Sequence, residues 1–573
     1  MTKTISIGNQ GFDDIREKQS FYIDKTKFIR DWWESEDKIT LITRPRRFGK
    51  TLNMSMLECF FSNRYRQRVD LFNGLSIWKE EKYRNLQGEY PVIFVSFAAV
   101  KADNFFDARN QIIDAVNEAY IAQQNVLKSS LLTEGERMVF GQLDLYTKDA
   151  SVNKTISNDI VCGALRTLCS CLMKVYGKKA IILLDEYDTP MQEAYVHGYW
   201  NEFTAFIRSL FNATFKTNQY LERAVMTGIT RVSKQSIFSD LNNLVVVTSS
   251  SDQYADCFGF TEKEVFCALD DFGMEDQKMQ VKEWYDGFIF GGQKDIYNPW
   301  SITNFLKEKK YRPYWASTSS NALVNKLIQT GSAKIKTYME ELIIGKNIVV
   351  NFDEQIVFEQ LETDENAIWS LLLASGYLKA DEVDYRGRLL EPWYHLSITN
   401  LETYGMFDGM FRGWFNNVSS DYNAFVKALL TDNIEEMNLY MNDVALATFS
   451  NFDTGKQTSR KTQPEKFYHG FVLGLLVELR DSYEVLSNHE SGYGRYDIML
   501  VPRDRTEHAI IMEFKVKDSK KEEKLRDTVK AALFQIKEKR YDSQLIEKGF
   551  EKESIKHYGF AFEGKQVLIG GCH

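Results

Sequence analysis

One stretch decides the fold: Arg44-Pro45-Arg46-Arg47-Phe48-Gly49-Lys50-Thr51. The apolar run Lys38–Thr43 precedes it and predicts a strand, and the pattern Leu52–Phe61 follows it and predicts a helix. A tight loop between a strand and a helix cradles phosphates, because the helix start offers unpaired N–H groups and the positive end of its dipole. Lys50 is expected to reach the β- and γ-phosphates of a nucleotide, and the Thr51 hydroxyl to hold Mg²⁺.

The nucleotide-binding residues predicted in this loop are Arg46, Arg47, Phe48, Gly49, Lys50 and Thr51. The loop departs from the usual G-x-x-x-x-G-K-[ST] pattern, because Arg44 stands at the position of the first glycine and narrows the backbone options there. A basic turn that happens to end in Gly-Lys-Thr is the alternative. The flanking strand and helix favour the phosphate cradle, with ATP as the expected cofactor.

A second signal lies at the end of the continuous apolar run Ala180–Leu184, which is typical of a buried parallel strand. The acid pair Asp185-Glu186 follows it directly. Asp185 is expected to bind Mg²⁺ through water, and Glu186 to polarise the attacking water as a catalytic residue. The alternative is a buried strand that ends in a solvated acidic turn.

A third strand candidate, Ala224–Thr227, is followed by a short loop that contains Arg231. Thr227 at the strand end is predicted to sense the γ-phosphate, and Arg231 to supply charge to the transition state. A strand cap with a surface arginine explains the same pattern. Both assignments therefore stay open at this point.

Strands and helices alternate over residues 1–260, which predicts an α/β domain with a parallel sheet and ligands at the carboxyl ends of its strands. Residues 261–455 read as a mainly helical lid or linker. The strand candidates of the first segment are Lys38–Thr43, Pro91–Phe97, Ala180–Leu184, Ala224–Thr227 and Leu244–Thr248, with helical patterns such as Phe105–Gln124 and Asn201–Thr217 between them.

The bulk composition is that of a globular protein with several domains: 573 residues, 44% hydrophobic and 26% charged. The seven cysteines lack paired C-x-x-C spacing, and no apolar run approaches the roughly 20 residues needed to span a bilayer. We therefore expect free thiols, a cytoplasmic location and no membrane contact. The net charge of -9 argues against a general nucleic-acid binder, but residues 456–573 carry 22 Lys and Arg against 19 Asp and Glu, which is compatible with contact to a phosphate backbone there.

A second chemical site is predicted in residues 456–573. Two strands joined as a hairpin carry Asp497 on the first and Glu513 with Lys515 on the second. The period of two places Glu513 and Lys515 on one face. An antiparallel pairing over the short turn brings Asp497 toward Glu513, in a register that the sequence alone leaves open.

These residues form the D…E-x-K pattern of metal-dependent phosphodiesterases. Asp497 and Glu513 are predicted to bind Mg²⁺ or Mn²⁺ as hard oxygen ligands, and Lys515 to activate water or neutralise developing phosphate charge. The alternative is a half-exposed edge hairpin in which Glu513 and Lys515 simply pair. His469 on the preceding helix either lines the same site or is a structural histidine, and the second interpretation is favoured.

Taken together, these motifs resemble the bacterial AAA-ATPase-like proteins, which typically carry a C-terminal PD-(D/E)XK nuclease-superfamily domain. The resemblance covers nearly the whole chain and is carried by Arg44–Thr51, Asp185–Pro190, Gly228–Asn243, Tyr285–Phe288 and Tyr297–Ser301. It implies a P-loop NTPase fold in residues 1–260 and a restriction-endonuclease-like α/β fold in residues 456–573. It also implies that Asp497, Glu513 and Lys515 fall on the nuclease motif and Gln535 on the helix after it.

The expected function is ATP binding and hydrolysis that controls metal-dependent cleavage of nucleic acid, with DNA as the expected substrate. The alternative is a nucleotide-dependent switch or scaffold whose C-terminal domain binds without cutting. An intact Asp-Glu-Lys set favours cleavage. A homo-oligomer is left open by the sequence.

Overall fold

The computed structural model divides into two compact units, which are described separately: residues 1–324 with 348–403, and residues 325–347 with 404–573. The residues described are 3–146, 156–230, 237–238, 241–316, 324–325, 327–328, 331–343, 345–353, 364–416, 422–448, 472–473, 475–476, 479, 482–487, 490–491, 494–518, 522–563 and 566–572.

The first unit is built on a five-stranded sheet in the order β2-β3-β4-β1-β5, with every neighbouring pair parallel. Its strands are β1 (Ile39–Thr43), β2 (Val92–Ser96), β3 (Ala180–Asp185), β4 (Leu221–Gly228) and β5 (Leu244–Val247). All residues of β1 and β3 are buried, as their continuous apolar sequences predict. The parallel α/β fold predicted for this part is confirmed.

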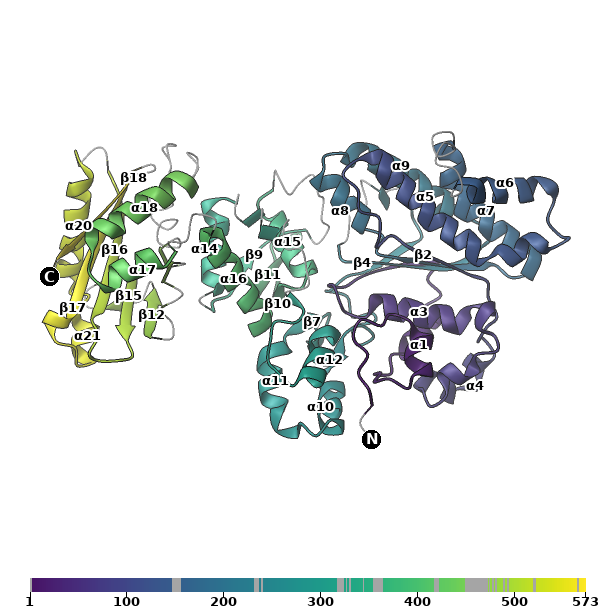
Figure 1. Ribbon diagram of the computed structural model, residues 1–573, viewed down its shortest axis with the longest axis horizontal. Helices are drawn as coiled ribbons and strands as arrows, with labels where there is room; N and C mark the ends of the chain where they lie inside the picture. Colours follow the sequence, from purple (N-terminus) through teal and green to yellow (C-terminus); the bar gives the residue numbers. More distant parts are fainter. Residues whose placement is uncertain are drawn as a thin grey trace. The chain divides into compact units, whose positions relative to one another are not determined.

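Helices cover both faces of this sheet (Figure 1). The longer helices α5, α7 and α9 lie on one side, and α1, α3 and α4 lie on the other. The helices of this part are α1 (Phe12–Glu17), α2 (Lys27–Glu34), α3 (Lys50–Phe61), α4 (Glu81–Arg84), α5 (Phe105–Ala122), α6 (Glu134–Tyr146), α7 (Asn158–Tyr176), α8 (Thr189–Val196) and α9 (Trp200–Phe211).

The segment after β5 opens with helix α10 (Glu262–Asp271), which starts with a capping box as its sequence predicts. Sequence analysis did not anticipate two small sheets here, in the orders β6-β8-β7 and β10-β11-β9. Their strands are β6 (Phe260–Thr261), β7 (Phe288–Phe290), β8 (Gln293–Tyr297), β9 (Ile348–Val350), β10 (Leu378–Arg386) and β11 (Glu391–Ile398), and the accompanying helices are α11 (Lys278–Tyr285), α12 (Pro299–Glu308) and α15 (Ala367–Ala374).

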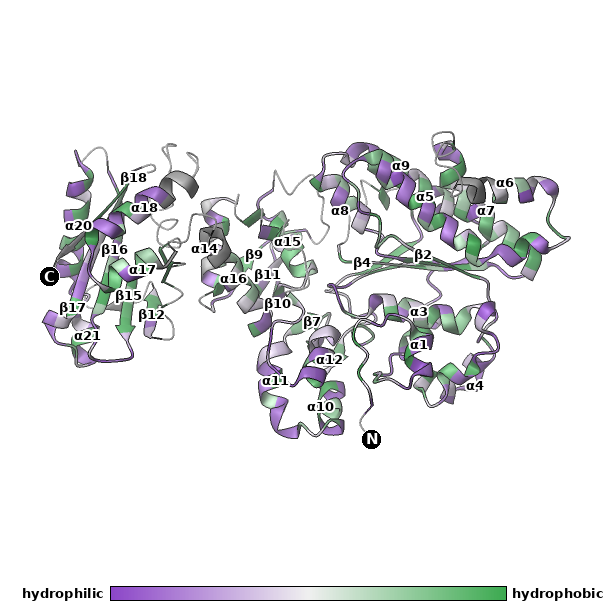
Figure 2. Ribbon diagram, in the orientation of Figure 1, coloured by the Kyte–Doolittle hydropathy of each residue, from purple (hydrophilic) through white to green (hydrophobic). Residues whose placement is uncertain are grey.

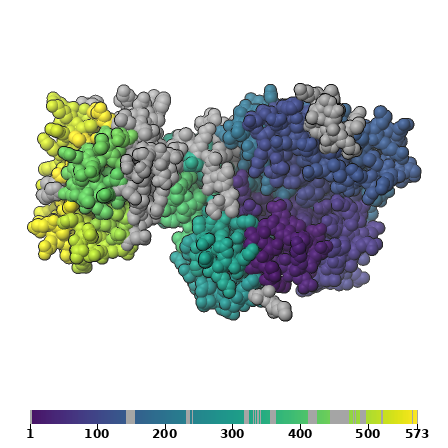
Figure 3. Space-filling view, in the orientation of Figure 1, coloured from purple at the N-terminus to yellow at the C-terminus, as the bar shows by residue number. Residues whose placement is uncertain are grey.

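The N-terminal residues pack against both this middle segment and the domain of the five-stranded sheet. Ile5 packs in the same apolar cluster as Val265 and Leu269. The Lys25 ammonium pairs with Glu264 at 2.7 Å. Figure 3 shows the purple N-terminal residues directly against the teal segment that follows the sheet. Residues on the two sides of the predicted boundary near residue 260 are thus in contact, and the three-part division remains a prediction.

The second unit contains a mixed sheet in the order β12-β15-β16-β17-β18. Only the β16–β17 pair is parallel, and helix α20 forms the crossover between these two strands. The elements are β12 (Tyr483–Ser487), β13 (Glu490–Ser491), β14 (Gly494–Arg495), β15 (Ile498–Pro502), β16 (Ala509–Val516), β17 (Ile555–Glu563), β18 (Gln566–Cys572), α14 (Ala333–Ile343), α17 (Tyr422–Leu430), α18 (Ile434–Thr448), α20 (Leu525–Lys539) and α21 (Ser543–Glu547), with α16 (Leu401–Asn416) beginning in the first unit. This mixed sheet confirms the predicted C-terminal α/β domain.

Helix α20 packs unusually close to the sheet because two strand positions lack side chains. A Cβ at Gly559 would lie 2.9 Å from the Val529 carbonyl, and one at Gly570 would lie 2.7 Å from the Val529 side chain. The opposite face of the sheet is covered by α17 and α18, whose Phe425 and Met441 belong to the same buried cluster as the strands. Figure 2 shows the central strands of this sheet as apolar and the outer surface of α20 as largely polar.

Two asparagines of α18 complete the hydrogen bonding of edge strand β18. The side chain of Asn438 donates to Ile569 O at 2.9 Å and accepts from Ile569 N at 2.7 Å. Asn442 makes the same pair of bonds with Val567, at 2.8 and 3.0 Å. The helix thus takes the place of a further strand and protects the edge from pairing with other chains. Within the described residues, no helix has the length and apolar character that crossing a bilayer requires.

Candidate functional site

The phosphate loop joins the carboxyl end of β1 to the start of α3. Gly49 takes φ 76° with no atom within 4 Å of the position that a Cβ would occupy, so the loop stays open there. Arg47 also has a positive φ of 66°, a strained value that is concentrated at functional sites. Lys50, 7% exposed, donates to the carbonyls of Arg44 and Pro45, each at 2.9 Å. Burial lowers the pKa of Lys50, against the opposing influence of nearby carboxylates.

The predicted magnesium ligands lie together at the end of β3. The Thr51 hydroxyl donates to Asp185 at 2.7 Å, and the Thr227 hydroxyl donates to the other oxygen of the same carboxylate. This meeting follows from the strand order, because β4 lies between β1 and β3 and all three end at one edge. Asp185 is 1% exposed, and burial raises its pKa although both hydroxyls oppose that shift. Thr51 and Asp185 supply oxygen donors of the kind that a divalent cation binds beside a triphosphate, and the Thr227 hydroxyl fixes the orientation of the carboxylate.

Glu186 leaves the strand in a positive-φ conformation, with φ 53°. Its carboxylate accepts a bond from the Thr189 hydroxyl at 3.1 Å, at the start of α8. Glu186, Asp185 and Asp188 all act to raise the pKa of Lys50 against the effect of burial. The predicted water-polarising acid directly follows Asp185 at the end of β3, and its catalytic role stays a prediction.

The remaining loop side chains divide into two kinds. Phe48, 1% exposed, packs edge-on against Phe288 at 4.7 Å, so only its backbone faces a ligand. Arg46 and Arg47 are exposed, and the Arg47 guanidinium lies 4.3 Å over the Trp300 ring. Arg231, the predicted charge donor, lies outside the described residues.

A buried acid, Asp188, was not predicted as a site residue. Asp188 is 1% exposed and accepts from the Thr230 N–H at 2.8 Å and the Thr230 hydroxyl at 2.7 Å. Tyr187 donates to the carbonyl of the same threonine at 2.7 Å. A Cβ at Gly228 would lie 2.5 Å from the Tyr187 ring. These residues fix the loop after β4, and the only sequence signal was the run of polar residues in Asp185–Pro190.

A second predicted site lies on β15 and β16 of the other unit. The strands pair Ile498 with Met512, so the next step of the register sets Asp497 opposite Glu513. Asp497 accepts from the Phe514 N–H at 2.8 Å, which holds its carboxylate at this strand. Glu513 is 2% exposed. The structure thus supplies the register that the sequence left open.

Gln535 of α20 connects the two charged groups of the E-x-K pattern. The Lys515 ammonium donates to Gln535 Oε1 at 2.7 Å, and the Gln535 amide donates to Glu513 Oε1 and to the Tyr541 hydroxyl, the latter at 3.1 Å. Burial raises the pKa of Tyr541 to about 12, so its hydroxyl stays protonated. Asp497 and Glu513 provide the hard oxygen donors that Mg²⁺ or Mn²⁺ requires. The Lys515 ammonium is held on the same strand as Glu513 through Gln535.

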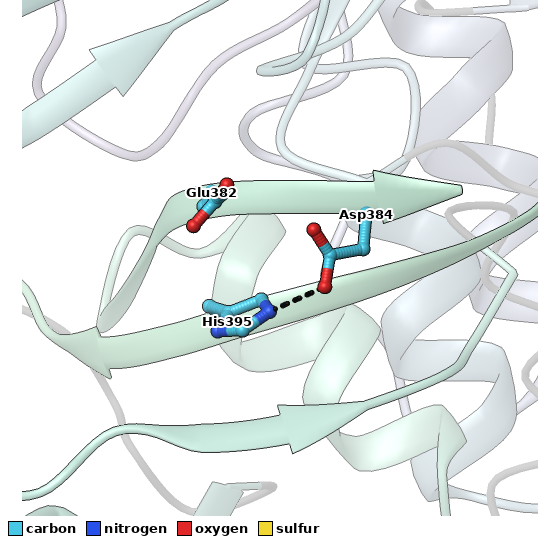
Figure 4. A group of neighbouring side chains, drawn as sticks. All are labelled: Glu382, Asp384 and His395. Carbon is cyan, nitrogen blue, oxygen red and sulfur yellow. Dashed lines mark hydrogen bonds and ion pairs between the residues drawn. The ribbon is translucent and has the colours of Figure 1, made fainter. Parts of the chain in front are cut away.

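Two other groups of potential metal ligands lie in the middle segment. Glu382, Asp384 and His395 place their ligand atoms within 4.8 Å of one another on β10 and β11 (Figure 4). The Asp384 carboxylate contacts His395 at 2.9 Å and Arg386 at 3.0 Å, and these two bonds lower its pKa. The Arg386 guanidinium thus already pairs with this carboxylate.

In the second group, Glu262, Asp286 and Asp295 surround the Lys282 ammonium. Burial raises the pKa of Asp286 to about 7. Neither group contains a residue that the sequence analysis singled out as a metal ligand.

Comparison with known proteins identifies both parts of the chain. Residues 6–238 match the family described as "Predicted AAA-ATPase", and residues 463–571 match the PD-(D/E)XK nuclease superfamily. The resemblance inferred from the motifs is confirmed. The AAA-ATPase-like domain contains the Thr51–Asp185–Thr227 cluster, and the nuclease-superfamily domain contains Asp497 and Glu513.

Individual relatives add little to this assignment. A protein of Azotobacter chroococcum mcd 1, described as "Uncharacterized protein in vnfD 5'region", is 24% identical over 407 residues, which are 70% of this chain and 68% of that protein. A structure of the Aeropyrum pernix ORC2 protein in ADPNP-ADP complexes matches 67% of this chain and 92% of that chain, with 8% identity and a TM-score of 0.23. Similarity at that level supports no inference about ligand or mechanism.

Proposed function

We propose that the AAA-ATPase-like domain binds and hydrolyses ATP with Mg²⁺, and that the nucleotide state controls cleavage of nucleic acid by the C-terminal domain. DNA is the proposed substrate, with Mg²⁺ or Mn²⁺ at the cleavage site. We place this activity in the cytoplasm, where buried free thiols such as Cys59 persist. An assembly of several copies is compatible with the proposal but is not required by it.

The proposal rests on the hydrogen bonds that join Gln535 of α20 to Glu513 and Lys515 of β16. These bonds hold Lys515 and Glu513 on one side of the sheet while the main chain of Phe514 holds Asp497. A bound divalent cation supplies a Lewis acid for the scissile phosphate. Lys515 is positioned to orient the attacking water or to balance the charge that develops on phosphorus oxygens. A simple edge hairpin needs no buried Glu513 and no amide that bridges it to the lysine.

The ATPase roles follow from the first site. Lys50 leaves its two carbonyls and binds phosphate, Thr51 and Asp185 hold the cation, and Thr227 orients the Asp185 carboxylate. Glu186 is the base that orients water toward the γ-phosphate. Burial raises the pKa of Asp185, and the hydrogen bonds from the Thr227 and Thr51 hydroxyls oppose that shift by favouring the carboxylate form.

Cleavage is tested with the full chain, labelled DNA and RNA, ATP, and Mg²⁺ or Mn²⁺. We expect cutting that is lost in Asp497→Ala and Lys515→Ala. Lys517→Ala is the matched control, because Lys517 follows two residues later and pairs with Glu563 instead of the site. If the parent protein binds but never cuts, the C-terminal domain is a binding module, and the switch alternative replaces the nuclease.

Hydrolysis is tested by phosphate release from ATP. Lys50→Ala and Glu186→Gln are expected to lower the rate by about a hundredfold or more, because each removes a group from the reacting phosphate. Glu193→Gln on α8 is the control, since its carboxylate faces His197. Equal rates in the parent and both site variants remove the ATPase part of the proposal.

A further inference from the structure

The first residue of the phosphate loop, Arg44, is a fully buried cation. Its side chain is 0% exposed, which is rare for arginine unless an acid accompanies it. Among the described residues, its hydrogen bonds go to main-chain carbonyls: Thr43 at 2.9 Å, Thr248 at 2.6 Å and Gln253 at 3.4 Å. Burial lowers its pKa to about 9, which leaves the guanidinium charged at neutral pH.

Among the residues that the structure describes, the side chains found stacked on this guanidinium are aromatic, and no ion pair with an acid is found. The guanidinium lies 4.5 Å over the Phe290 ring of β7 and 5.9 Å over Phe258. A ring face attracts a cation, but it carries no net charge to balance one. A buried charge that lacks a counter-charge is costly and creates a strong local potential, because protein around it screens poorly.

Arg44 also lies where an anionic ligand is expected. Its N–H bonds to Gly228 O at the carboxyl end of β4, and its own carbonyl accepts from the Lys50 ammonium at 2.9 Å. The main chain of Arg44 is therefore at the root of the predicted phosphate loop, and its guanidinium lies between this root, the end of β5 and β7. The usual pattern has glycine at this place, which supplies no charge.

We propose that Arg44 is a positioning residue for nucleotide binding: a fixed cation beneath the loop, balanced by the polyphosphate of the bound nucleotide and anchored on β7. The proposal rests on the ATP-binding function given above. In the usual loop, the first glycine supports phosphate binding through its backbone flexibility. In this chain, the buried charge of Arg44 takes over that support. It also explains why an aromatic strand from the middle segment closes over the base of the loop.

Arg223 provides a matched control within the same sheet. It is 9% exposed, donates to the carbonyls of Trp32 and Trp33 at 3.0 and 2.6 Å, and lies 4.5 Å over the Trp33 ring. It stands near the amino end of β4, whereas Arg44 follows the carboxyl end of β1. The two arginines thus share burial, carbonyl partners and aromatic stacking, and differ in their distance from the loop.

The test measures the affinity of the full chain for a fluorescent ATP analogue and for AMP, with thermal unfolding in the absence of nucleotide. Arg44→Met is expected to weaken ATP binding by about tenfold or more, and AMP binding by less, because AMP carries fewer charges. Arg44→Lys is expected to recover much of the loss. Arg223→Met is expected to change stability but not affinity. Arg44→Gln, which keeps one amide donor, replaces the methionine variant if that does not fold.

Salt separates this buried charge from the exposed arginines of the loop. The loss in Arg44→Met should persist from about 0.05 M to about 0.5 M KCl, whereas the loss in Arg46→Met should fade, because salt screens exposed charges more than buried ones. Unchanged ATP affinity in Arg44→Met or Arg44→Gln overturns the proposal. So does an Arg44→Lys variant that binds as weakly as the neutral ones, since the role would then be structural. If the parent protein binds no ATP, the proposed function itself fails.

Discussion

Glu402 allows a pH prediction whose size follows from the structure. This residue of α16 is 1% exposed, accepts from the main-chain N–H groups of Trp315 and Ala316 at 2.5 and 3.4 Å, and accepts from the Ser301 hydroxyl at 2.7 Å. Burial raises its pKa from 4.5 to about 7, against these three bonds. The shift is worth about 3 kcal/mol of folding free energy, at about 1.4 kcal/mol for each pH unit.

The sign follows from proton binding. Between pH 4.5 and about 7 the folded protein holds a proton on Glu402 that the unfolded chain releases, so folding stability falls as the pH rises. The free-energy cost of holding Glu402 ionised in the folded protein is absent below its ordinary pKa of 4.5 and complete above its raised pKa of about 7. Glu402→Gln removes the titration and keeps the contacts, because an amide oxygen accepts from both N–H groups and the amide nitrogen donates to Ser301.

We expect Glu402→Gln to match the parent near pH 4.5 and to exceed its stability by up to about 3 kcal/mol at pH 8. The assay is urea unfolding followed by tryptophan fluorescence across this pH range. Glu283→Gln serves as the control, since Glu283 is exposed on α11. A variant that is weakened equally at both ends of the range would show that the carboxylate is needed for its hydrogen bonds and that its buried charge costs little.

Four further substitutions test the packing and polar contacts of the two sites. Thr227→Val removes one hydrogen-bond donor to the buried Asp185 carboxylate and is expected to lower the free energy of unfolding by about 1–3 kcal/mol. An unchanged midpoint of urea unfolding would show that this bond does not stabilise the fold. Gly559→Ala places a methyl group 2.9 Å from a carbonyl of α20 and is expected to lower stability by about 1–3 kcal/mol, which calorimetry of the full chain would detect or refute. Asn442→Ala uncovers part of the β18 edge, and we expect sedimentation to show more self-association than in the parent. Equal or lower self-association would rule out the edge-capping role of Asn442. Gln535→Leu is expected to slow cleavage by about 10–100-fold while DNA binding persists, and loss of binding as well would point to a folding defect.

The sheet of the first unit could be read from the sequence because each strand is a continuous apolar run. β3 reads Ala180–Asp185 and is buried throughout, so its hydrophobicity and the acid at its end are both visible in the sequence. The phosphate loop was equally visible, since Gly-Lys-Thr has few other uses between a strand and a helix. The contact between Thr51 and Asp185 follows once the strands are parallel and end at one edge.

The middle segment was harder to predict because some of its strands have only two or three residues and the longer ones, β10 and β11, are largely exposed or half-buried. β10 alternates charged and apolar residues over Leu378–Arg386, with a register shift between Ala380 and Glu382, and this weakens the period-two signal. Polar residues that turn out buried were also missed. Asp188 and Glu402 look like solvated acids in the sequence, and only the tertiary fold supplies their N–H and hydroxyl partners.

The aromatic motif at the start of α12 links the nucleotide loop to the route along the chain toward the nuclease domain. Asn298 donates to a loop carbonyl at 3.3 Å, and the Trp300 ring lies 4.3 Å under a loop guanidinium. The next residue, Ser301, bonds to Glu402 on α16, and Tyr404 begins the second unit. Under the nucleotide control proposed above, this turn is the part of the structure to test first, because Asn298 and Trp300 contact the loop while Ser301 contacts Glu402 of α16.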